Sequence, residues 1–195
     1  MAQATQAQVP VLEVHLEDYY HALLPFEQWD KQPERIVPMT YELLWLLRRT
    51  CTHAVFYVLG HVAQRHPKLL ADLVAESHTI GSHGYYHRHG EYEGDYSDVL
   101  ARKYFAPHRV HGYRSPYWDT TQKPGWSGGG FLRLLPYTIL RQNILRSGVL
   151  WLHPHDIDVQ TPIRSLRRRL GLQSAYRKFY RLLTELHFDE GYLRK

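Results

Sequence analysis

The chain has 195 residues, a length typical of one domain, and we predict a single domain over residues 1–195. Hydrophobic residues make up 44% of the sequence, which is typical of a soluble globular protein with a real core. The net charge is +5, and much of it lies in a basic C-terminal segment, residues 162–195. No nucleic-acid motif accompanies these charges, so we interpret them as the solvated face of a helix rather than a nucleic-acid or membrane contact.

Cysteine usage and the first residues of the chain indicate the compartment. Cys51 is the only cysteine, so no disulfide can form within the chain. The opening residues, MAQATQAQVPVLEV, lack the basic and apolar regions of a signal peptide, and we expect residues 1–9 to be flexible. No apolar run approaches the roughly 20 residues of a membrane span. We therefore expect a cytoplasmic protein without a membrane span.

Strands and helices are predicted to alternate along the chain. Hydrophobic patterning and turn residues predict strands at residues 9–16, 53–60, 78–84, 109–118 and 148–158. Helices are predicted at residues 40–49, 61–77 with a break at Pro67, 95–105 with Asp95 or Ser97 as cap, 131–147 with a break at Pro136, and 162–187. This alternation predicts an α/β fold whose active site lies at the carboxyl ends of the strands.

The segment SHGYYH, residues 82–87, is a candidate metal site. His83 and His87 are four residues apart, so on one helical turn they would face the same ion. A carboxylate would complete a His₂–carboxylate set with open positions for water or substrate. Glu17 and Asp18 follow the first predicted strand, and either could be that ligand. The alternatives are a chance pair in a chain with 14 histidines, and a capping or surface acidic pair.

Two later segments carry further candidates. Arg114 in GYRSPYW precedes a proline that stiffens the loop, so it could hold a carboxylate or phosphate, or form a structural salt bridge. His153 in LWLHPHDID ends a strand, where it could act as a general acid with a nearby acid orienting its ring. The alternative for His153 is a satisfied histidine at a strand end.

In their order along the chain, these segments resemble the polysaccharide deacetylase family, which carries the NodB homology domain and is of the carbohydrate esterase type. The chain resembles a short and divergent member over roughly residues 10–160. The segments that carry the resemblance are HLEDYYH (15–21), HAVFYVLGHVAQRHPKLLADL (53–73), HTIGSHGYYH (78–87), HGYRSPYW (111–118), GGGFLRLLP (128–136) and LHPHDID (152–158).

The resemblance implies a distorted, incomplete (β/α) barrel and the hydrolytic removal of an acetyl group from an N-acetylated sugar. A divalent metal, with zinc as the expected ion, would be bound by His83, His87 and an acidic residue. The third ligand would be Asp18 or Glu17, because two variants of the family's first motif space these carboxylates differently.

The resemblance also implies roles in catalysis for other residues. His153 would be the general acid, Arg114 would orient the base, and Tyr117 would line the sugar site. The family's base is an aspartate, and His15 stands in that position. A histidine can accept a proton near pH 7, so His15 is a candidate base, and Glu17 is another if Asp18 binds the metal.

A second departure from the family is the short segment WDTTQKPGWS (118–127), where relatives carry a further strand and long loops. The barrel is therefore expected to be truncated, with an open side or a partner that covers it. We predict N-deacetylation of a carbohydrate substrate during assembly of a surface polysaccharide such as O-antigen. The rivals are a non-catalytic sugar- or metal-binding relative, a hydrolase of another C–N bond, and a basic nucleic-acid-binding module. The sequence leaves open whether the chain forms a homo-oligomer.

Overall fold

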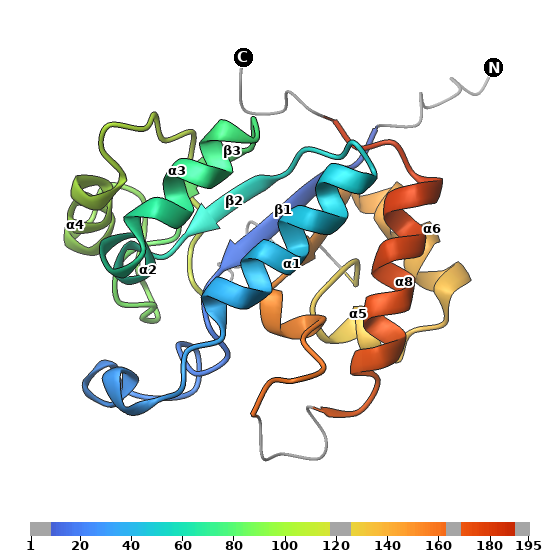
Figure 1. Ribbon diagram of the computed structural model, residues 1–195, viewed down its shortest axis with the longest axis horizontal. Helices are drawn as coiled ribbons and strands as arrows, with labels where there is room; N and C mark the ends of the chain where they lie inside the picture. The colour runs from blue at the N-terminus through green and yellow to red at the C-terminus, as the bar shows by residue number, and fades with distance from the viewer. Residues whose placement is uncertain (1–8, 118–125, 163–168, 190–195) are drawn as a thin grey trace.

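A four-stranded parallel sheet forms the centre of the protein in this computed structural model, which describes residues 9–117, 126–162 and 169–189 (Figure 1). The strands are β1 (Val11–Leu16), β2 (Val55–Val58), β3 (Thr79–Ser82) and β4 (Val149–Leu152). Their order is β3-β2-β1-β4, so β1 is a central strand that pairs with both β2 and β4. Within the described residues the sheet is open, which confirms an α/β fold with an incomplete barrel.

Helices occupy the connections between the strands. They are η1 (Phe26–Lys31), α1 (Ile36–Arg49), α2 (Gly60–Arg65), α3 (Pro67–Ala75), α4 (Tyr96–Phe105), α5 (Gly130–Leu134), α6 (Tyr137–Ser147), η2 (Pro154–Asp156) and α8 (Leu172–Glu185). The predicted breaks at Pro67 and Pro136 are confirmed, because a new helix begins at or directly after each proline. Asp95 is the N-cap of α4, and its carboxylate accepts the N–H of Asp98 at 2.8 Å.

The two faces of β1 have different surroundings. Leu12, Val14 and Leu16 belong to the main hydrophobic core, with apolar residues of α1, which lies across the sheet in Figure 1. Glu13 and His15 alternate with them and therefore point to the opposite face. All six residues of β1 are buried, as is usual for a parallel strand covered on both sides. This second face leads to the polar residues that follow β1.

Helix α1 begins at Ile36, four residues before the predicted start. The reason is a cap that comes from another part of the chain. The carboxylate of Asp18 accepts the backbone N–H groups of Arg35, at 2.6 Å, and Ile36, at 2.9 Å. A negative charge at this end also interacts favourably with the helix dipole. The first turn of α1 therefore lies before the predicted helix start at residue 40.

The strand predicted at residues 109–118 is wrong. Within the described part of this stretch, Tyr113 forms only an isolated bridge with Ser82 at the end of β3. Gly112 has a left-handed backbone with φ of 79°, which interrupts an extended strand.

The basic segment forms a helix over part of the predicted range, because α8 covers residues 172–185. Three basic residues of this segment lie outside the described residues: Arg164, Arg167 and Arg168. Residues 1–8, for which flexibility was predicted, lie outside them as well. In the described ranges, no helix combines the length and the apolar character that crossing a membrane requires.

Candidate active site

A cavity of about 390 Å³ lies at the carboxyl ends of the strands. Its walls come from the end of β1, the loop after β3, the start of α5 and the residues that follow β4. Parallel strands place their carboxyl ends at one edge of a sheet, so the loops after different strands meet there. The cavity brings together six of the predicted site residues: His15, Glu17, His83, His87, Tyr117 and His153.

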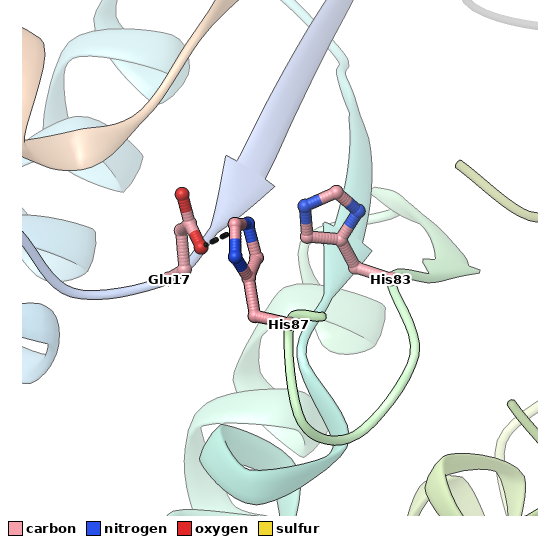
Figure 2. A group of neighbouring side chains, drawn as sticks. All are labelled: Glu17, His83 and His87. Carbon is pink, nitrogen blue, oxygen red and sulfur yellow. Dashed lines mark ion pairs between the residues drawn. The ribbon is translucent and has the colours of Figure 1, made fainter. Parts of the chain in front are cut away.

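Glu17, His83 and His87 form a compact group at this cavity (Figure 2). Each offers a ligand atom, these atoms lie within 4.8 Å of one another, and all three residues are buried. Nε2 of His87 is 2.8 Å from Oε2 of Glu17, the ion pair drawn in Figure 2. Two imidazoles and one carboxylate are a donor set found in catalytic zinc sites, which keep a position for water or substrate. These residues therefore fit a divalent metal ion.

His83 is oriented by the backbone of the Arg114 segment. Its Nδ1 lies 2.6 Å from the carbonyl oxygen of Arg114, and because a carbonyl can only accept, Nδ1 donates the proton. Nε2 then carries the lone pair and is available to a metal. Ligating histidines commonly use their second ring nitrogen in this way, which fixes the tautomer and the ring orientation.

The two histidines lie in a loop, which corrects the prediction of a shared helical turn. Gly84 and His87 have left-handed backbones, with φ of 68° and 51°, and such residues interrupt a helix. Oγ of Ser97, in the first turn of α4, accepts the backbone N–H of Tyr85 at 2.7 Å and so ties the loop to α4. The i, i+4 spacing therefore brings the two rings together through a tight turn of the loop rather than through helix periodicity.

The two acidic residues after β1 are used differently. Glu17 is part of the ligand group, whereas the carboxylate of Asp18 caps α1 and also accepts the N–H of Tyr19 at 2.9 Å. Burial raises the pKa of Asp18 to about 6, against the opposing effect of these backbone hydrogen bonds. Burial also favours protonation of Glu17, but the neighbouring His87 and the other imidazoles outweigh it and hold the pKa of Glu17 well below its ordinary value. An ionised Glu17 is suited to a cation.

His153 lies between two carboxylates. Its Nε2 is 3.2 Å from Oε1 of Glu17, and its Nδ1 is 3.0 Å from Oδ2 of Asp156. Burial acts to lower the pKa of His153, but its hydrogen bond to Asp156 and the two negative charges raise the pKa above its ordinary value. The imidazole is thus held in one orientation and favours its protonated form, as a proton donor requires.

His15 is buried at the centre of a group of rings. Its ring centroid lies 4.9 Å from that of His83 and 5.2 Å from that of His153. Burial, followed by the charges of those two histidines, lowers the pKa of His15 well below its ordinary value. His15 is therefore neutral at pH 7 and has a lone pair that can accept a proton, but it is a weak base.

The guanidinium of Arg114 forms an ion pair with Glu13, which is 1% exposed. It also lies over the ring of Tyr57, 5.1 Å from the centroid. Glu13 precedes His15 by two residues on the same face of β1, so the pair lies directly beneath the predicted base. Arg114 is not among the described lining residues of the cavity, and its carboxylate partner is Glu13.

Tyr117 lies at the rim of the cavity and is 40% exposed. Its ring stacks on His89, with centroids 3.7 Å apart, and lies 4.7 Å from the ring of His87. The hydroxyl donates to the carbonyl of Ala22 at 3.1 Å. An exposed ring held in this way can contact an apolar face of a sugar.

The lining residues that were not singled out from the sequence include Arg133, Trp151 and His155. Trp151 packs against Gly129 so closely that a side chain at Gly129 would meet the indole ring. The signal that could have found this contact is the GGG run before Arg133, because consecutive glycines often mark a close approach of another group. Asp156 was anticipated only as an unnamed acid beside His153.

Two family models match the sequence. Residues 27–117 match the model described as polysaccharide deacetylase, and residues 120–192 match a domain of unknown function, DUF3473. The first match includes His83 and His87 but begins after β1, so it does not include His15 or Glu17. No curated protein matches the chain.

Solved structures of deacetylases share the fold. A peptidoglycan N-acetylglucosamine deacetylase, Bc1960, superposes with a TM-score of 0.57 and 17% identity, covering 96% of this chain and 87% of that one. Peptidoglycan deacetylase PdaC from Bacillus subtilis gives 0.52 and 15%, with 94% and 88% covered. A mutant of BA3943, described as a CE4 family pseudoenzyme with restored enzymatic activity, gives 0.54 and 11%, with 92% and 64% covered. At these identities, the likeness concerns the fold.

The family matches and the fold agree with the motifs. Residues 27–117 match the polysaccharide deacetylase family, and the chain resembles a short and divergent member of it. The resemblance inferred from the sequence is thereby confirmed, and the open parallel sheet is an incomplete form of the family's (β/α) barrel. The single domain over residues 1–195 and the roles of the individual site residues stay predictions.

Proposed function

We propose that the protein is a metal-dependent N-deacetylase that acts on an N-acetylated sugar of a surface polysaccharide of the O-antigen kind. One observation carries this proposal: Glu17, His83 and His87 place their ligand atoms within 4.8 Å of one another at a cavity that also contains His153. The match of residues 27–117 to a polysaccharide deacetylase family supports the reaction type. Zinc as the metal and a cytoplasmic location are parts of the same proposal.

The ligand group would hold the metal through Nε2 of His83, Nε2 of His87 and a carboxylate oxygen of Glu17. When bound, such an ion lowers the pKa of a water molecule toward 7 and polarises a carbonyl group. The carbonyl of Arg114 keeps Nε2 of His83 deprotonated, and the ionised Glu17 supplies negative charge. The chain therefore presents a neutral imidazole and an ionised carboxylate in the protonation states that a metal requires.

His153 is proposed to deliver a proton to the departing nitrogen as the amide C–N bond breaks. Asp156 holds Nδ1 of His153, so Nε2 is the atom that faces the cavity and the reacting group. Arg133 and Trp151 form part of the wall around it, and Tyr117 is proposed to contact the sugar ring.

His15 is proposed as the base that takes a proton from water, in the position where the family has an aspartate. A histidine in that position, buried against the rings of His83 and His153, favours a second candidate function: a deacetylase-like protein that binds sugar or metal without hydrolysis. The pseudoenzyme relative whose activity a mutation restores supports considering this candidate. A base typically contributes about 10²–10⁴-fold to a rate.

The test is metal content of the purified protein together with acetate release from N-acetylated sugars. We expect close to one equivalent of zinc in the wild type and its loss in His83→Ala/His87→Ala. We also expect acetate release by the wild type and none by this variant. His108→Ala/His187→Ala, which removes two histidines outside the cavity, is the matched control and keeps the metal.

The same assay separates the alternatives. Metal without acetate, followed by acetate release in His15→Asp, identifies a protein that binds but does not hydrolyse. Release of acetate from small amides but not from N-acetylhexosamines indicates another C–N bond as the target. A wild type that binds no metal refutes the proposed centre.

A further inference from the structure

A second cavity of about 700 Å³ lies at the start of α8 and shares no lining residue with the catalytic cavity. Among the described residues that line it, basic side chains are present and acidic ones are absent. The basic residues are Arg169, Arg177, Lys178 and Arg181. We call this cavity the basic groove. A concave surface with one sign of charge concentrates ligands of the opposite sign.

Two of the four cations already have partners. Arg181 pairs with Glu185, at 2.6 Å, and Lys178 donates to backbone carbonyls of the α5 segment, the shortest contact being 2.7 Å to Leu135. Arg169 and Arg177 are exposed, and neither has an ion pair or hydrogen bond to another described residue. The groove therefore contains two exposed guanidinium groups, and guanidinium matches phosphate and carboxylate in a bidentate way.

The backbone at this place adds positive potential. Helix α8 has 14 residues, and its N-cap, Gly171, has no side chain to accept the first free N–H groups. Gly171, Leu172, Gln173 and Ser174 all line the groove. The first turn of a helix of this length carries partial positive charge and N–H donors that suit an anion. The dipole and the two arginines therefore act on the same space.

One short segment connects the groove to the catalytic cavity. Gly129, Gly130 and Arg133 line the catalytic cavity, whereas Tyr137, directly after them, lines the groove. The carbonyl of Arg133 accepts from Lys178 at 3.1 Å, and α5 packs against α8, as Figure 1 shows. The α5 segment therefore borders both cavities. A glycan chain that occupies the catalytic cavity can extend across α5 into the groove.

We propose that the basic groove binds an anionic group, phosphate or carboxylate, of the same glycan whose N-acetyl sugar occupies the catalytic cavity. This inference rests on the proposed deacetylase function and narrows its substrate class to charged glycans. The anion is carried on a neighbouring part of the glycan rather than on the reacting sugar, because the α5 segment lies between the two cavities.

Binding of three probes to the zinc-loaded full chain tests this proposal. The probes are N-acetylchitotetraose 1-phosphate for phosphate, a hyaluronan tetrasaccharide for carboxylate, and neutral N-acetylchitotetraose. Isothermal titration calorimetry measures their affinities for the wild type and for Arg169→Gln/Arg177→Gln. We expect at least one anionic probe to bind more tightly than neutral N-acetylchitotetraose, and to lose about tenfold or more in affinity in the variant. The probe that responds identifies phosphate or carboxylate.

The control variant is Arg109→Gln/Arg146→Gln, which removes the same charge from exposed positions outside both cavities. The proposal is overturned if both double variants lose affinity equally, if neutral N-acetylchitotetraose binds as tightly as the anionic probes, or if neither anionic probe binds. Acetate in the titration cell is assayed separately. Loss of groove binding with intact acetate release refutes only this inference, and intact groove binding without acetate refutes only the hydrolase.

Discussion

Successive side chains of strand β1 point to opposite faces of the sheet, and the two faces have different roles. Leu12, Val14 and Leu16 pack into the hydrophobic core, where they hold the sheet against the helices. His15 lines the cavity from the opposite face, and Glu17 continues the same alternation one residue beyond the strand. In a strand buried on both sides, alternation therefore separates residues that stabilise the fold from residues that build the site.

The largest expected effect comes from the site face. Glu17→Gln removes the negative ligand while keeping its shape, so we expect loss of bound metal and a fall in kcat/KM of about 10³-fold or more. The fold should survive, because Glu17 is outside the core cluster. Metal analysis and acetate release measure the first effect, and a urea titration in the absence of metal measures the second.

Asp18→Asn is the matched control for Glu17→Gln. It neutralises the adjacent carboxylate, which caps α1, so it should cost about 1 kcal/mol of stability and leave the metal bound. The opposite pattern, with metal lost from Asp18→Asn and kept by Glu17→Gln, would exchange the two assignments.

A smaller effect is expected from Asp156, which orients the proposed proton donor His153. Asp156→Asn weakens the contact that orients His153, so we expect kcat to fall by about 10²-fold with the metal content unchanged. KM should change little, because Asp156 is expected to act through its contact with His153. If KM rises and kcat is kept, Asp156 shapes the cavity rather than the proton donor.

A substitution on the core face of β1 is expected to lower stability rather than metal binding. Leu16→Ala removes a fully buried side chain and should destabilise the protein by about 2–5 kcal/mol. Because Leu16 points away from the cavity, the folded fraction should still bind one equivalent of metal. Urea midpoints and metal stoichiometry measured on the same sample test this separation, and a variant that folds fully but binds no metal would contradict it.

Which of these residues could be found from the sequence depends on how local their partners are. His83 and His87 are close in the chain, so their spacing suggested a pair even though the loop, and not a helix, brings them together. The alternation of strands and helices likewise placed His153 at a strand end. Local patterns were therefore sufficient to name these candidates, whereas the order of the motifs along the chain and the resemblance to a known family were needed to assign roles to them.

Long-range partners were not readable. Which of Glu17 and Asp18 belongs to the ligand group depends on Arg35 and Ile36. Their backbone N–H groups donate to the carboxylate of Asp18, which then caps α1. The partner of Arg114 is Glu13, which is 101 residues away. Such contacts arise only when the sheet is assembled, and one sequence contains no local signal for them.

The opposite end of the sheet provides the last of these effects and a contrast with the site. His78 precedes β3, is buried, and accepts the backbone N–H of Ala54 on Nδ1 at 3.3 Å. Burial, followed by the charge of His53, lowers the pKa of His78 to about 4. The unfolded chain binds this proton near pH 6.5, so the stability that neutral His78 contributes is complete above pH 6.5 and is lost as the pH falls toward 4.

His78→Gln removes the imidazole whose pKa differs between the folded and the unfolded chain. Between pH 7.5 and 4.5, the wild type should lose about 2 kcal/mol more of its unfolding free energy than the variant does. Urea titrations at several pH values measure both curves, with the metal removed so that the site histidines contribute equally to each. Parallel curves would mean that His78 is protonated in the folded protein, and that its burial does not act on pH stability.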